Sequence, residues 1–155
     1  TLQIDEFKFK CCIGKKGSTS NKKEGDKKSP KGTFQIENLY FREDRIKKPL
    51  TLLKCIKIKK DIGWCDDINF PKKYNKLIKI EKKIRHEKLK RKDNKYDLLI
   101  PIKYNFNKPT SGKGSCIFIH LTKNYQPTAG CIALKKKDFL IMLKLIKKNS
   151  KIKIF

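Results

Sequence analysis

The chain has 155 residues, the size of one domain, and is long enough to bury a core without metal or disulfide support. Hydrophobic residues make up 37% and aromatic residues 10%, which excludes a disordered chain. Forty-one Lys and Arg against fifteen Asp and Glu give a net charge of +26, which disfavours polycationic partners and favours anionic ones. The sequence holds no run of about 18 apolar residues, so no membrane-spanning segment is predicted.

The positive charge is weak evidence for function. Nearly all of the excess is Lys, spread through the chain, whereas base reading favours Arg. The preferred interpretation is therefore solvated lysines on every face, with no specific nucleic-acid partner. A basic nucleic-acid-binding module without catalysis remains the alternative function.

The first half of the chain predicts strands. Apolar and polar residues alternate at 7–13, 33–39 and 52–58, and a glycine-rich turn at 14–32 separates the first two segments. Turn residues surround the single Trp64, and the basic stretch that follows predicts a short helix at 87–91.

The second half predicts further strands at 96–104, 115–120, 131–134 and 151–155. Pro101 predicts a sheet edge or a bulge, because proline lacks the amide that a central strand needs.

The hydrophobic period changes after residue 134. One helical stripe carries Phe139, Met142, Leu143 and Ile146, which predicts an amphipathic helix over about 135–148. Together the elements predict a mainly β fold, a sandwich or barrel with this helix packed on it, in one domain spanning 1–155. We expect a monomer.

The six cysteines are not expected to pair. Cys11 and Cys12 are adjacent, no CxxC motif is present, and a domain of this size does not need bridges.

His120 and Cys131 form the clearest candidate for chemistry. His120 ends a predicted strand, and the chain returns through 128–130 to Cys131 at the start of the next. A neighbouring imidazolium can lower a thiol pKa from roughly 8.5 to about 3.5–7.5, which would make Cys131 a thiolate nucleophile. Cys116 lies about 13 Å from His120 along the strand and is a poorer candidate. The alternative is that both residues only pack, and a zinc site is disfavoured because close-spaced partner ligands are missing.

Gly130 precedes the candidate nucleophile. A glycine there lets the chain turn tightly and expose main-chain amides, and an acyl-transfer site needs such donors for its oxyanion. The amides of Gly130 and Cys131 are the natural candidates.

The segments around these residues resemble the active-site signature of the YkuD-type L,D-transpeptidases, in which a His and a loop precede Ser or Thr, any residue, Gly and Cys. The similarity to a compact proteobacterial branch of that family extends along nearly the whole chain. It is carried by segments 14–17, 23–26, 29–34, 64–67, 74–75, 96–97, 114–120 and 127–134.

The resemblance implies a β-rich YkuD fold and ping-pong acyl transfer on peptidoglycan stem peptides, without metal or organic cofactor. Cys131 would attack the carbonyl of an L-centre and form a thioester, which an amine resolves as a cross-link or water resolves by hydrolysis. His120 would shuttle the proton, Thr128 would support the site with its hydroxyl, and Gly130 and Cys131 would supply the amides. The substrate implies a periplasmic or cell-wall location, whereas the unpaired cysteines leave a cytoplasmic location open.

Two departures limit what carries over. Many relatives have His before the Gly, and Arg or Asn two residues after the Cys, where this chain has Ala129 and Ala133. Contacts to substrate carboxylates therefore do not carry over, and third-to-third and first-to-third cross-links both stay open.

Further substrate-binding candidates follow from the same resemblance and from the loop between His120 and Cys131. For each there is a purely structural alternative: the tryptophan and Tyr96 would pack in the core, the two aspartates would cap turns, and the loop residues would be solvated. They are Trp64, Asp66, Asp67, Tyr96, Lys123 and Tyr125. His86 is expected at the surface.

Overall fold

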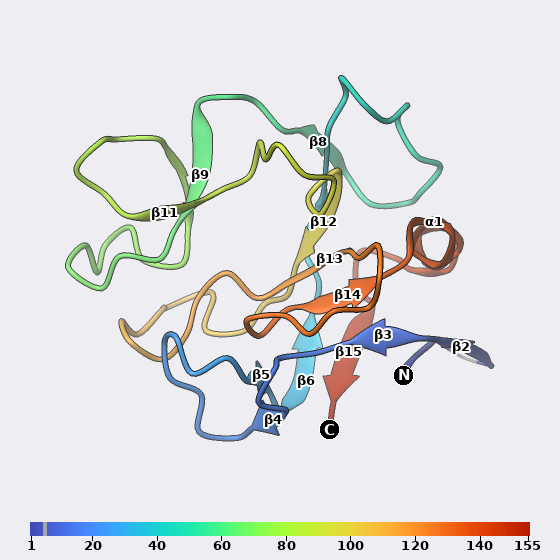
Figure 1. Ribbon diagram of the computed structural model, residues 1–155, viewed down its shortest axis with the longest axis horizontal. Coiled ribbons are helices and arrows are strands. Elements are labelled where there is room, and N and C mark those ends of the chain that lie inside the picture. The colour runs from blue at the N-terminus through green and yellow to red at the C-terminus, as the bar shows by residue number, and fades with distance from the viewer. Residues whose placement is uncertain (5) are drawn as a thin grey trace.

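The computed structural model describes residues 1–4 and 6–155 and is built around a six-stranded mixed sheet (Figure 1). The strand order is β3-β14-β13-β12-β7-β8, with β13 parallel to β14 and β7 parallel to β8. These strands are β3 (Cys11–Cys12), β7 (Leu39–Phe41), β8 (Cys55–Lys57), β12 (Leu98–Pro101), β13 (Phe118–Leu121) and β14 (Ile132–Leu134). The mainly β fold predicted from the sequence is confirmed.

Smaller sheets surround this one. Their strands are β10 (Leu77–Lys79), β9 (Ile62–Cys65) and β11 (His86–Lys88) in one sheet; β15 (Lys151–Ile154) with β6 (Gly32–Gln35); β1 (Leu2–Ile4) with β2 (Phe7–Phe9); and β4 (Ser18–Thr19) with β5 (Ser29–Pro30). In Figure 1, β9 and β11 lie at the upper left and helix α1 (Lys136–Leu145) at the right, with β12, β13 and β14 between them.

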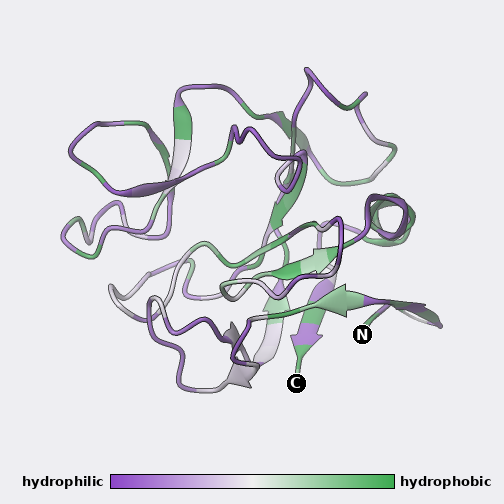
Figure 2. Ribbon diagram, in the orientation of Figure 1, coloured by the Kyte–Doolittle hydropathy of each residue, from purple (hydrophilic) through white to green (hydrophobic). Residues whose placement is uncertain are grey.

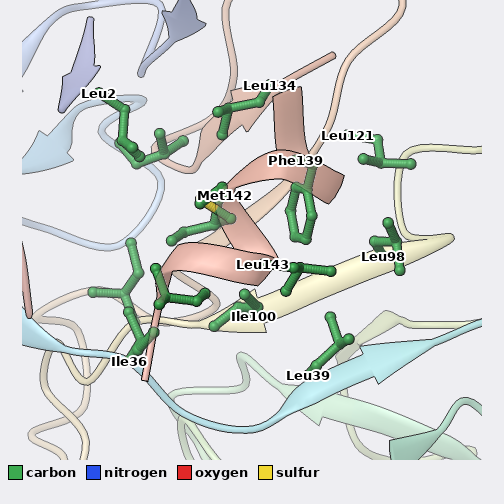
Figure 3. Close-up of a cluster of buried hydrophobic side chains, with 14 of the residues drawn as sticks. Leu2, Ile36, Leu39, Leu98, Ile100, Leu121, Leu134, Phe139, Met142 and Leu143 are labelled. Carbon is green, nitrogen blue, oxygen red and sulfur yellow. The ribbon is translucent and has the colours of Figure 1, made fainter. Parts of the chain in front are cut away.

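The main sheet is covered on both faces because its strands alternate between two apolar clusters. Along β13, Ile119 and Leu121 join the cluster beneath α1, whereas Phe118 points to the opposite face and packs with Trp64. Figure 3 shows the first cluster, in which side chains from α1 meet those of β12, β13 and β14. His120 shares the face of Phe118, so the candidate site lies on the side away from the helix.

Helix α1 confirms the predicted stripe. Phe139, Met142 and Leu143 are at most 1% exposed, and burying a side chain of this size contributes roughly 1.5–3 kcal/mol. The helix is shorter than the predicted 135–148, because Ile146 has extended dihedral angles, although its side chain is still buried.

The predicted helix at 87–91 is wrong. His86–Lys88 forms β11 instead and pairs antiparallel with β9, with Glu87 opposite Trp64. Pairing with a distant strand has overridden the weak local pattern.

Pro101 does not lie on an edge strand, because β12 runs between β13 and β7. The register slips beside it: Leu99 pairs with Tyr40 but Ile102 pairs with Ile36, so one side carries an extra residue. This irregularity agrees with the bulge that was the other expectation for Pro101.

Hydrophobic residues gather on the central strands, and hydrophilic residues lie on the outside of the fold. Figure 2 shows hydrophobic residues along β12 and β14 and hydrophilic ones on the outer loops. Within the described part of the chain, no helix has both the length and the apolar character to span a membrane.

Candidate active site

The β13–β14 pair places His120 and Cys131 on one face of the sheet. His120 pairs with Ala133, and Cys131 stands two positions before Ala133, so their side chains share a face. With a rise of about 3.3 Å per residue and a strand spacing of about 4.8 Å, their Cα atoms lie about 8 Å apart on the diagonal. Both residues line one cavity of about 330 Å³.

The Cys131 sulfur is a protonated thiol in the resting site. It is buried, donates to the main-chain carbonyl of Cys116 at 3.1 Å, and accepts the Phe118 amide at 3.4 Å. Burial raises the pKa of this thiol to about 12, because the thiolate loses its hydration. The thiolate expected from the sequence is therefore not the resting form.

His120 is neutral in the same state. Its side chain is only 6% exposed, and burial lowers the pKa of the imidazole to about 4. Nδ1 lies 2.9 Å from the carbonyl oxygen of Leu121, which can only accept, so Nδ1 carries the hydrogen and the lone pair is on Nε2. The ring packs edge-to-face on Tyr96, with centroids 5.3 Å apart. The cavity is thus lined by a neutral imidazole and a neutral thiol.

Gly130 shapes the turn that enters Cys131. Its φ of +144° is rarely open to other residues, and a Cβ there would lie 2.8 Å from the carbonyl oxygen of Lys28. The wholly buried Ser29 donates to the Gly130 carbonyl at 2.8 Å and accepts the Gly14 amide at 3.0 Å. Sequence reasoning missed Ser29, although it lies in a segment that carries the family resemblance.

Thr128 closes the same turn. Its hydroxyl donates to the Cys131 carbonyl at 2.6 Å and accepts the Gly130 amide at 3.1 Å. The Gly130 amide is therefore already engaged and is not free to bind an oxyanion in this conformation. Of the two expected donors, the Cys131 amide is the remaining candidate.

Basic side chains line the 330 Å³ cavity. The substrate-binding candidates Tyr96 and Lys123 line it, together with Arg91 and Lys95, which sequence reasoning did not single out. Arg91 is paired with Asp93 at 2.7 Å and sits over the Tyr96 ring. The basic stretch that contains Arg91 carried no sequence signal that separates a cavity wall from a solvated surface.

A second cavity of about 230 Å³ also reaches Cys131 and Tyr96. Its wall includes Glu24, Cys116 and Asp66, and Asp66 pairs with Arg85 at 3.1 Å. Asp66 therefore lines a cavity that reaches Cys131, but not the cavity that contains Lys123.

Trp64 and Asp67 have the structural roles that were the alternatives to substrate binding. Trp64 is a core residue that packs edge-to-face on Phe118, with its indole nitrogen 2.9 Å from Asn75 Oδ1. Asp67 caps a turn by accepting the amides of Asn69 and Arg85, both at 3.0 Å.

The structure also places the remaining residues that the sequence singled out, which are Tyr125, His86 and the six cysteines. The amino groups of Lys10 and Lys135 lie over the Tyr125 ring, 4.8 and 5.2 Å from its centroid. His86, expected at the surface, is half-buried in β11, with Nδ1 2.7 Å from the Ile84 carbonyl. All six cysteines are free, and no group of three or more His, Cys, Asp or Glu suited to a metal occurs among residues 1–4 and 6–155.

This arrangement defines a β protein with a thiol and a basic imidazole facing one cavity. Comparison with family models matched residues 3–154 to YkuD, the L,D-transpeptidase catalytic domain. The match spans nearly the whole chain, so the protein belongs to this family, as the sequence motifs predicted. No curated protein and no solved structure matched the chain.

Proposed function

We propose that the protein is a peptidoglycan L,D-transpeptidase in which Cys131 is the nucleophile and His120 is the proton shuttle. The observation that carries the proposal is their shared cavity and shared sheet face, within a chain that matches the family along nearly its whole length. The substrates would be two stem peptides, one giving an acyl group and one giving an amine. Such substrates imply a periplasmic or cell-wall location.

The first half-reaction starts from the neutral pair. Cys131 Sγ attacks the carbonyl carbon of an L-centre in the donor stem while its proton moves to His120 Nε2. The Leu121 carbonyl, 2.9 Å from Nδ1, stabilises the imidazolium that forms. His120 then passes the proton to the departing amine of the following D-residue, the C–N bond breaks, and a thioester remains.

The second half-reaction reverses these roles. An amine of the second stem attacks the thioester carbon and gives a proton to His120 Nε2. The C–S bond breaks, sulfur recovers a proton, and the new amide is the cross-link. Water in place of the amine gives a carboxylate, which is the carboxypeptidase outcome.

The main chain would stabilise the tetrahedral oxyanion. The Cys131 amide is the donor that the turn leaves as a candidate, and Thr128 and Ser29 keep that turn in place. Loss of one oxyanion donor typically costs about 2.7–4 kcal/mol of barrier.

The charge of the cavity suits the donor. Lys95 and Lys123 line the side that contains His120, and a stem peptide carries carboxylates that these ammonium groups attract. We expect this contact to affect the KM for the donor more than kcat, because it is made before and during the reaction alike.

Intact-mass measurement tests the proposal. A stem tetrapeptide, or a carbapenem whose strained amide a thiol can open, should add an acyl group to the wild-type protein. The adduct should be absent from Cys131→Ala and present on Cys55→Ala, which removes another free, half-buried thiol. A wild-type protein without an adduct, or an adduct that persists on Cys131→Ala, would contradict the proposal. Linkage analysis of the cross-linked product separates third-to-third from first-to-third bonds.

A further inference from the structure

The main chain of Cys116 is held where it passes the nucleophile. Its carbonyl accepts the Cys131 thiol at 3.1 Å, and its amide donates to Asn75 Oδ1 at 3.1 Å. Cys116 also has a φ of +54°, in the left-handed region that non-glycine residues seldom occupy. Such a conformation persists where neighbouring groups hold it.

Asn75 is fixed in a single orientation. Its Oδ1 accepts the Cys116 amide and the Trp64 indole N–H, and its Nδ2 donates to the carbonyls of Tyr104 at 3.1 Å and Asn105 at 2.7 Å. The first two partners can only donate and the last two can only accept, so the amide cannot turn over. The side chain is 4% exposed, which makes each of these contacts costly to lose.

The residues just before Cys116 are anchored as well. The Gly114 amide donates to the Tyr74 hydroxyl at 3.2 Å, and the Ser115 hydroxyl donates to Glu24 at 2.7 Å. Tyr74 also donates to Glu24. The segment 114–116 is therefore tied to residues far away in the sequence at each position, and its carbonyl at Cys116 has little freedom to move.

The two main-chain contacts of the Cys131 sulfur favour opposite protonation states. A carbonyl oxygen attracts S–H and repels a thiolate, whereas an amide N–H attracts the thiolate. The Cys116 carbonyl thus keeps the proton on sulfur, and the Phe118 amide is ready for the anion once the proton leaves.

We infer that Asn75 is a positioning residue for the nucleophile: it fixes the Cys116 carbonyl, which aims the Cys131 thiol and restrains its proton until His120 takes it. The inference rests on the proposed function only in taking Cys131 as the nucleophile. It assigns a task in the reaction to a side chain that does not touch the substrate.

Asn75→Gly is the test variant, because glycine accepts the φ of +54° at this position and only the side chain is lost. Trp64→Phe is the matched control: it disturbs the same core and removes another partner of Asn75, but leaves the Cys116 contact in place. The readout is the rate at which iodoacetamide alkylates Cys131 at pH 8, resolved by peptide mass spectrometry and divided by the rate at Cys55. Turnover with a stem peptide is measured in parallel.

In Asn75→Gly we expect Cys131 to react roughly two- to tenfold faster, the worth of one typical hydrogen bond, while kcat falls and KM changes little. Trp64→Phe should lower the melting temperature without the faster alkylation. An unchanged rate ratio in Asn75→Gly, or the same rise in Trp64→Phe, would overturn the inference. If Asn75→Gly does not fold, Tyr74→Phe, which frees the Gly114 amide, is held to the same expectation. Alkylation needs no substrate, so a wild-type protein that forms no acyl-thioester would refute the proposed function and leave this measurement standing.

Discussion

Acidification should destabilise the protein through His120. The imidazole is 6% exposed and burial lowers its pKa to about 4, whereas a histidine in an unfolded chain has a pKa near 6.5. The unfolded chain therefore takes up this proton first as the pH falls. The stability that comes from keeping His120 neutral is complete above about pH 6.5 and is lost as the pH falls towards about 4.

The size of the effect follows from these two values. Each pH unit over which only the unfolded chain is protonated costs 1.36 kcal/mol, so the free energy of unfolding should fall by about 2 kcal/mol between pH 7 and pH 5. That loss is a large share of the roughly 5–15 kcal/mol that stabilises an ordinary domain.

Urea unfolding at pH 7 and pH 5 measures this loss, with the fluorescence of the single, buried Trp64 as the signal. The comparison is with His120→Asn, whose amide can still donate to the Leu121 carbonyl but does not titrate. Carboxylates titrate in both proteins, so their contribution cancels in the difference. Wild type should lose about 2 kcal/mol more than the variant over this range. Equal losses in the two proteins would refute the reasoning, and His120→Asn should in any case keep the circular-dichroism spectrum while losing turnover.

Three further substitutions test the packing around the site by urea unfolding. Gly130→Ala should lower stability by about 2–4 kcal/mol and abolish acylation, because its Cβ would meet the Lys28 carbonyl in a strained backbone; an active, equally stable variant would contradict this. Ser29→Ala should cost about 2–4 kcal/mol, since the Gly14 amide and the Gly130 carbonyl lose a buried partner, and a loss below 1 kcal/mol would contradict this role of Ser29. Phe139→Ala should cost about 3–5 kcal/mol by opening a cavity under α1, and a neutral effect would mean that the helix is not packed as described.

Local periodicity explains what the sequence predicted well. The stripe at Phe139, Met142 and Leu143 requires only a 3.6-residue repeat, and the structure buries all three. The order of strand, loop and strand likewise placed His120 at the end of one segment and Cys131 at the start of the next, and these two segments are parallel neighbours in the sheet. In each case the information lies within a short stretch of chain.

Long-range hydrogen bonds explain what the sequence did not reveal. Ser29 holds Gly130 from 101 positions away, and Asn75 holds Cys116 from 41 positions away. The local sequence around a serine or asparagine in a loop does not distinguish a buried side chain from an exposed one. The helix predicted at 87–91 was wrong for a related reason, because the strand that pairs with β11, β9, lies more than twenty residues earlier in the chain.

The resting pair is uncharged for a physical reason. An ion pair would place a thiolate and an imidazolium in a site where both residues are less than a tenth exposed. The free energy lost by removing the two charges from water would offset most of their Coulomb attraction. Holding both groups neutral avoids that cost while the cavity is empty and also leaves the sulfur unreactive towards oxidants and electrophiles. In the proposed mechanism, charge would be created only as Sγ attacks, when the Phe118 amide would lie beside the sulfur, the Leu121 carbonyl beside the imidazolium and the Cys131 amide beside the oxyanion. On the proposed function, a site organised in this way would favour the transition state over the empty enzyme, which is the condition that catalysis requires.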